Sequence, residues 1–136
     1  MSDQDDDQRY LALRVVLMPR DTNSHGSIFG GVILSQIDLA AAVGANHEIR
    51  NRGSQAKRLV TVGMNSVEFH RPVFVGDLLS FWTRLVRIGN TSIAIHVEVE
   101  SERDGRLQNL TEAEVTYVAV KIDGDQRSPV PVLDKS

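Results

Sequence analysis

Residues 32–49 read VILSQIDLAAAVGANHEI, and the other predicted elements are arranged around this segment. It contains no proline and has four alanines near its middle. Apolar residues recur three or four positions apart, at 33, 37, 40 and 41 and again at 34, 41 and 45. That spacing predicts a helix of about 17 residues. Because the apolar positions cover most of its circumference, we expect the helix to be buried rather than to lie on a surface.

On both sides of this helix the sequence changes to strand-like runs. Tyr10–Met18 is rich in Leu and Val and ends at Pro19, and a loop of turn-forming residues leads into the helix. After a polar connection, the predicted strands are 59–69, 78–88, 93–99 and 111–122. Strands joined by short connections pair antiparallel. The sequence therefore predicts an α+β fold in which one antiparallel sheet of about five strands wraps a single helix.

Such a sheet covers the helix on one side only, and apolar residues would remain in contact with water. A homo-oligomer is expected for that reason.

The length of 136 residues suits one domain. We expect an acidic disordered tail over 1–8, a single domain over 9–123 and a polar C-terminal tail over 124–136. The longest apolar stretch, Leu39–Ala45, is far shorter than a membrane span, so no membrane association is expected. The chain has no cysteine, which excludes disulfides and thiolate metal sites and fits a reducing, cytoplasmic location.

Charge argues against a nucleic-acid partner. Four acids lie in the first seven residues, so the net charge of −3 leaves a body close to neutral. The dense positive cluster consists of Arg50, Arg52, Lys57 and Arg58, with no acid between them. Four charges fit one small polyanion better than a nucleic-acid backbone.

Asp38 is the most informative polar residue, because its neighbours at helical spacing are apolar. A carboxylate on such a face is costly unless it is hydrogen-bonded or catalytic, although an aspartate at the edge of the stripe that reaches solvent is the simpler alternative. Gly31 lies seven residues earlier, close to two helical turns, where the helix begins. Free N–H groups at a helix start can bind a developing oxyanion. Asp38 and Gly31 would then face one cleft as base and oxyanion donor.

Other chemistries lack their patterns. Asn23 lies in the loop before the helix, where it is either a turn residue or a ligand for water or a carbonyl. The four histidines show no metal-binding spacing, so no metal site is expected. No GxSxG, GxGxxG or Walker pattern is present, which leaves a serine nucleophile and nucleotide hydrolysis unsupported.

Several motifs in fixed order carry a family resemblance. They are D-T-N-x-x-G-x-I-F-G-G, R-L-V-T-V-x-M-x-S-V-x-F-x-x-P-V-x-V-G-D, G-N-T-S-I, V-E-V and T-x-A-x-x-T-Y-V-A-V. As a set, over roughly residues 15–122, the sequence resembles the hotdog-fold acyl-CoA thioesterases of the YciA-like type. The resemblance implies a five- or six-stranded sheet around a long central helix. It also implies a homodimer with active sites at the interface, with dimers commonly gathered into a hexamer as a trimer of dimers.

The resemblance also implies roles for single residues. Asp38 matches the carboxylate that acts as general base on water or as nucleophile on the thioester. Asn23 matches the loop residue that works with the carboxylate of the partner subunit. Gly31, with Gly30 beside it, matches the turn whose amide polarises the thioester carbonyl. The positions associated with the phosphates and pantetheine of CoA are matched by Arg58, Asn90, Thr91 and Ser92. No cofactor is implied besides the CoA of the substrate.

Two other functions compete with acyl-CoA hydrolysis. A non-catalytic acyl-CoA sensor on the same fold would lack the base, and Asp38 argues against it. A hotdog enoyl-CoA hydratase would place a histidine-centred pair on or beside the helix, whereas His47 is remote from the Gly30-Gly31 turn.

Overall fold

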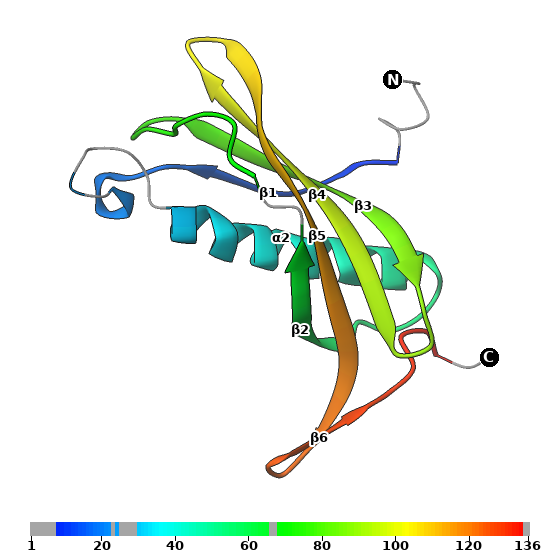
Figure 1. The fold of residues 1–136 in the computed structure, drawn as a ribbon. Helices are drawn as coiled ribbons and strands as arrows, with labels where there is room; N and C mark the ends of the chain where they lie inside the picture. Colours follow the sequence, from blue (N-terminus) through cyan, green and yellow to red (C-terminus); the bar gives the residue numbers. More distant parts are fainter. Residues whose placement is uncertain (1–7, 23, 25–29, 66–67, 135–136) are drawn as a thin grey trace.

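The computed structural model describes residues 8–22, 24, 30–65 and 68–134, and Figure 1 shows one long helix lying across a sheet. The acidic segment predicted to be disordered lies, except for Gln8, outside the described residues. Asn23 and His25 lie outside them as well. No helix of the described residues is long and apolar enough to cross a membrane.

The helix, α2, spans Gly30–Asn51 and is 22 residues long, somewhat longer than predicted. Its alanine-rich middle favours helix, and no proline interrupts it. Gly53 ends it, because its φ of 84° is a left-handed conformation that glycine adopts without strain. The N–H groups of Gly53 and Ser54 then donate to the carbonyls of Arg50 and Ile49.

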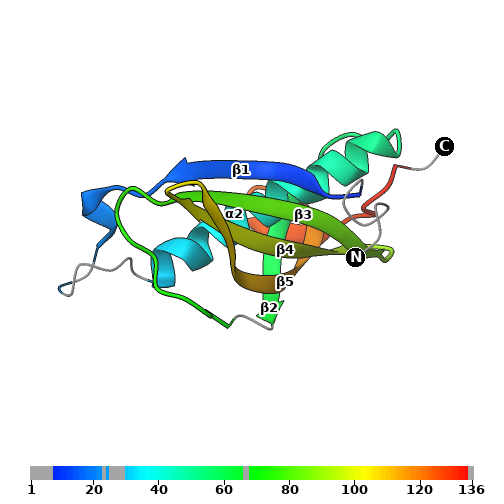
Figure 2. The same cartoon turned by 90° about the horizontal axis from the view of Figure 1, so that it is seen from above.

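The sheet is antiparallel throughout, in the order β1-β3-β4-β5-β2, with β6 added to β5. Its strands are β1 (Tyr10–Val16), β2 (Arg58–Asn65), β3 (Leu78–Ile88), β4 (Ser92–Arg103), β5 (Arg106–Asp123) and β6 (Gln126–Pro129). A short 3-10 helix, η1 (Pro19–Asp21), follows β1. The two views place α2 along one face of the sheet (Figures 1 and 2). The predicted α+β hotdog arrangement is confirmed.

The core lies between α2 and one face of the sheet. Its helix residues include Ile33, Ile37 and Ala41, which are fully buried. Gly44 allows the closest approach, because a Cβ there would lie 2.6 Å from the Cβ of Thr83 on β3. The expectation that the helix is buried around most of its circumference is wrong on its far side, where Leu39 remains 54% exposed. A sheet can cover only one side of a helix, so apolar residues on the other side stay open.

The C-terminal segment belongs to the domain, in contrast to the polar tail predicted over 124–136. β6 pairs with the end of β5, and the N–H of Val132 donates to the carbonyl of Asn90 at 2.9 Å. The Val132 side chain is completely buried in the core. The apolar residues of this segment, Val130, Val132 and Leu133, lie close together but beside Pro129 and Pro131, which argue against a strand. They nevertheless pack into the core next to the β3–β4 turn.

An ion pair between a buried carboxylate and a half-exposed arginine holds the other end of the sheet. Asp77, 2% exposed, accepts two hydrogen bonds of 2.6 Å from the guanidinium of Arg103 and one of 3.0 Å from the N–H of Phe74. The bonds from Arg103 are the main reason why the pKa of Asp77 lies below its ordinary value. The pair ties the loop before β3 to the end of β4.

We predict that Asp77→Asn lowers the free energy of unfolding by about 2 kcal/mol at neutral pH, because a neutral amide loses the charge-assisted bonds. A lowered pKa in the folded state stabilises the fold above the unfolded pKa of about 3.9, and this contribution disappears as the pH falls through the folded value. The difference between wild type and variant should therefore shrink below about pH 4 in urea unfolding curves. Asp125→Asn, in the exposed β5–β6 turn, serves as control. A difference that stays constant down to about pH 2 would contradict this account.

Candidate active site

Asp38 lies about two turns after the start of α2, and two hydroxyl groups hold its side chain. Thr61 Oγ1 donates to Asp38 Oδ1 at 2.7 Å, and the Tyr117 hydroxyl lies 2.9 Å from the same oxygen. The Tyr117 hydroxyl also contacts the backbone carbonyl oxygen of Asp38. Both side-chain contacts involve Oδ1. Among the described residues, Oδ2 has no hydrogen-bond partner, and it is therefore the oxygen available to a bound molecule.

The sheet register brings the two hydroxyls together. Thr61 of β2 and Tyr117 of β5 are direct cross-strand partners, so both side chains point to the face that carries α2. A register shift follows between Thr61 and Gly63, and such a bulge re-aims the strand locally. The carboxylate of Asp38 is thus fixed by two strands that are more than twenty residues away in sequence.

Tyr117 remains a hydrogen-bond donor over the whole working range of pH. Its side chain is 1% exposed, and this burial, together with the neighbouring Asp38 carboxylate, raises the pKa of the phenol far above its ordinary value of 10.0. The O–H proton therefore stays on Tyr117. The arrangement keeps Asp38 Oδ1 occupied and its orientation defined.

Gly30 and Gly31 open the same helix, and both are exposed. A Cβ on Gly31 would meet nothing within 4 Å, whereas one on Gly30 would contact the ring of Phe69 at 3.6 Å. The first turn of a helix carries N–H groups without helical partners. Gly31 and Asp38 are about 10 Å apart along the axis, and helix side chains lean toward the N-terminus, which brings the carboxylate closer to these groups.

The sequence did not identify Thr61 or Tyr117 as site residues. Tyr117 belongs to the predicted strand 111–122, in which Val118, Val120 and Ile122 share one face and Tyr117 lies on the other. The structure buries the alternate face, with Val115, Tyr117 and Ala119, while Ile122 is 39% exposed. One signal was present: a tyrosine on a buried strand face needs a partner for its hydroxyl. Nothing in the sequence identified that partner as Asp38.

The positions matched to CoA binding gather around the end of β5. Arg58 pairs with Val120 and Ser92 pairs with Val118, so the two residues flank β5 at about two strand spacings, roughly 10 Å. The carbonyl oxygen of Thr91 accepts a bond from Ala119, and that of Asn90 from Val132, which fixes the turn between β3 and β4. This group lies on the sheet face opposite to Asp38, because neighbouring residues on a strand alternate between faces.

Two of the four residues of the predicted basic cluster form ion pairs within the chain. Lys57 is bound to Asp134 at 2.6 Å, and Arg52 pairs with Glu48 at 3.3 Å. Arg50 and Arg58 are exposed and have no ion pair with any residue that the structure describes. The assignment of Arg58 to the phosphates of CoA, which the resemblance implies, stays a prediction. Asn23, the remaining predicted site residue, lies outside the described residues.

Comparisons with known proteins place the chain in a family. The family model for the Thioesterase superfamily matches residues 25–108. The chain is 42% identical over 130 residues to the acyl-CoA thioester hydrolase YciA of Salmonella typhimurium, and the match covers 92% of each protein.

Solved structures agree. A hexameric hotdog fold thioesterase of Campylobacter jejuni, Cj0915, is 46% identical with a TM-score of 0.74, and the match covers 88% of this chain and 89% of that one. The hexameric thioesterase y2039 of Yersinia pestis is 38% identical with a TM-score of 0.76, covering 90% and 95%. The chain therefore belongs to the Thioesterase superfamily, among the hotdog-fold acyl-CoA thioester hydrolases of the YciA type.

Proposed function

We propose that this protein hydrolyses acyl-CoA thioesters to the free carboxylic acid and CoA, with Asp38 as the general base. One observation carries the assignment of the base: a carboxylate on α2 is held through one oxygen by Tyr117 and Thr61, while the other oxygen has no hydrogen-bond partner among the residues that the structure describes. The curated relative at 42% identity is itself an acyl-CoA thioester hydrolase.

The reaction follows from these groups. Asp38 Oδ2 takes a proton from a water molecule, whose oxygen attacks the thioester carbonyl carbon. The carbonyl oxygen becomes an oxyanion, and the N–H of Gly31, supported by Gly30, stabilises it at the positive end of the helix. The C–S bond then breaks, CoA leaves as the thiolate, and the carboxylic acid remains. The CoA thiolate finally takes up the proton that Asp38 accepted from water, which returns Asp38 to its carboxylate form.

A second copy of the chain completes the site in this proposal. β2 pairs only with β5 among the described strands, so its outer edge is free for another strand. Three exposed apolar side chains lie near the site residues in sequence: Leu39 and Val43 follow Asp38 on α2, and Val62 follows Thr61 on β2. These residues would be buried in a homodimer, and the family resemblance assigns Asn23 of one copy to work with Asp38 of the other. The hexameric relatives fit a trimer of such dimers.

The proposed reaction needs neither a metal nor an organic cofactor, because a thioester is activated enough for a base, an oxyanion donor and correct positioning. A cytoplasmic location fits the absence of cysteine. A hydratase is disfavoured because His47 stacks on Tyr10 with ring centroids 3.7 Å apart. His47 lies 16 residues after Gly31, about 24 Å along the helix axis.

We predict that Asp38→Ala lowers kcat by at least about 100-fold, and Asp38→Asn somewhat less, because removal of a general base costs about 10² to 10⁴. The measurement is steady-state release of CoA from a panel of acyl-CoAs, followed with a thiol reagent. Asp125→Asn removes an equal charge from an exposed turn and should leave kcat unchanged. Near wild-type turnover of a folded Asp38→Ala protein would rule out the assignment of Asp38 as the base, whereas binding of acyl-CoA without any turnover by the wild type would favour the sensor alternative.

Tyr117 is a positioning residue in this mechanism. We predict that Tyr117→Phe lowers kcat about 10-fold or more with little change in KM, because a misplaced base loses rate without losing ground-state binding. The chain contains one other tyrosine, Tyr10, whose ring packs on His47, so Tyr10→Phe is a matched control. Thermal unfolding of both variants separates positioning from stability. If kcat fell only in proportion to the unfolded fraction, the hydroxyl would have no role in positioning Asp38.

Arg58 is assigned to the phosphates of CoA, together with the turn formed by Asn90, Thr91 and Ser92. We predict that Arg58→Ala raises KM for an acyl-CoA several-fold with kcat nearly unchanged, because the nucleotide end is bound equally in the ground and transition states. KM for the matching acyl-pantetheine, which lacks the nucleotide, should not change. Salt should reduce the effect, since exposed charges are screened beyond about 10 Å at 0.1 M.

Arg106→Ala, at the opposite end of β5, is the control for the loss of one exposed arginine. Equal losses on acyl-CoA and acyl-pantetheine would show that Arg58 supports the fold or the catalytic centre instead.

A further inference from the structure

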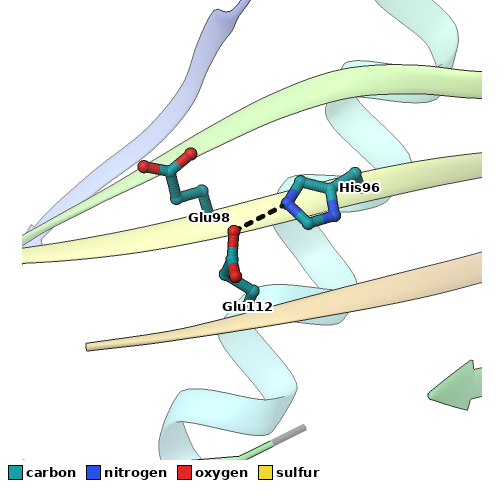
Figure 3. A group of neighbouring side chains, drawn as sticks. All are labelled: His96, Glu98 and Glu112. Atoms are coloured by element: carbon teal, nitrogen blue, oxygen red, sulfur yellow. Dashed lines mark hydrogen bonds and ion pairs between the residues drawn. The ribbon is translucent and has the colours of Figure 1, made fainter. Parts of the chain in front are cut away.

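Three side chains that can bind metal ions meet on the sheet face that points away from α2. His96 and Glu98 lie on β4 and Glu112 lies on β5 (Figure 3). One ligand atom from each residue lies within 4.8 Å of those of the other two. His96 Nε2 and Glu112 Oε1 are 3.2 Å apart, and Figure 3 shows these two groups facing each other. The cluster is thus already assembled by the fold.

Pairing of β4 with β5 creates this cluster. Glu98 and Glu112 are direct cross-strand partners, and His96 is two residues from Glu98, on the same face. No local spacing in the sequence reveals the group, because its members come from two strands. Two carboxylates directly opposite each other on neighbouring strands repel, and this repulsion destabilises the sheet. A cation between them would remove that cost.

The geometry fits a metal ion that accepts nitrogen and oxygen ligands. Zinc binds imidazole nitrogen at about 2.0–2.1 Å and carboxylate oxygen at about 2.0–2.2 Å, so two ligands at a tetrahedral angle lie about 3.4 Å apart. The observed separation of 3.2 Å between His96 Nε2 and Glu112 Oε1 is close to this value. A carboxylate oxygen of Glu98 lies within 4.8 Å of the other two ligand atoms and would supply the third protein ligand, with water as the fourth.

The surroundings add acidic groups and a further imidazole. A hollow next to the cluster is lined by Glu68, His70, His96, Glu112, Ala113 and Glu114. Positive charge comes from Arg84, the β3 partner of His96, and from Arg9, which lies 3.4 Å from Glu98 Oε1. Asn109 reaches the same oxygen at 3.5 Å, so both neighbours act on Oε1 of Glu98 rather than on Oε2. The acids outnumber the arginines around the cluster.

We infer that His96, Glu98 and Glu112 form a binding site for a divalent transition-metal ion and that the site prefers zinc. The ion joins β4 to β5 and stabilises the sheet. Imidazole with carboxylates favours zinc over magnesium or calcium, which prefer oxygen ligands alone. The site lies on the opposite face from Asp38, so the ion takes no part in the proposed hydrolysis, and the inference does not depend on that function.

The test is calorimetric titration of Zn²⁺ into the intact, tag-free, metal-free oligomer. We expect one Zn²⁺ per chain and a midpoint of thermal unfolding that rises by at least about 3 °C at saturating Zn²⁺. His96→Ala and Glu112→Gln should each weaken binding at least about 10-fold, since each removes a ligand. Glu102→Gln removes an equal charge from the same strand outside the cluster and should bind like wild type. Circular dichroism and elution volume confirm that every variant is folded.

Co²⁺ provides an independent readout, because its visible absorption reports an ordered ligand set. Wild type should show this absorption, and His96→Ala should lose it. Absence of Zn²⁺ binding by wild type would overturn the inference. Equal weakening of binding in Glu102→Gln and Glu112→Gln would also overturn it, because it would show only a general attraction of the ion to an acidic surface. Acyl-CoA hydrolysis measured with and without saturating Zn²⁺ is expected to agree within about 2-fold, so the fate of this site and that of the proposed activity are separable.

Discussion

The hydrogen bonds between the Asp38 carboxylate and the hydroxyls of Tyr117 and Thr61 connect the three elements on which the site depends. They join α2 to β5 and β2, so the position of the carboxylate follows from helix packing and from sheet register at the same time. A shift of β2 by one residue would turn Thr61 to the other face. Tyr117 is buried, and the carboxylate and backbone carbonyl oxygens of Asp38 are the acceptors that satisfy its hydroxyl.

The two faces of the sheet carry different groups of residues. The inner face buries α2 and holds Asp38, while the outer face carries Arg58 and Ser92 at one end and the His96, Glu98 and Glu112 cluster farther along β4 and β5. The nucleotide end of CoA extends well beyond its thioester, so its binding residues need not share a face with the base. The exposed Leu39 and Val62 leave the inner region open for a second copy of the chain.

Periodicity was sufficient to predict the helix and most strands, because each of those signals is local. β3 begins and ends at the predicted residues, Leu78 and Ile88, and Asp38 was singled out by its apolar helical neighbours. Three features depend on contacts that local pattern does not encode: the Tyr117 partner of Asp38, the burial of Val132 and the cluster around His96. Each arises from strands or segments that meet only in the folded chain. The assignments of Asn23, Gly31 and the CoA-binding residues stay predictions.

In the proposed mechanism, Asp38 is the base of a site that a second copy of the chain completes. Subunit mixing tests this arrangement. Asn23→Ala and Asp38→Ala, each nearly inactive alone, are exchanged in equal amounts, and exchange is confirmed by native mass spectrometry. Half of the dimers should then be heterodimers with one intact site of two, so the account predicts about a quarter of wild-type activity. A mixture that never exceeds its two parents despite complete exchange would contradict it.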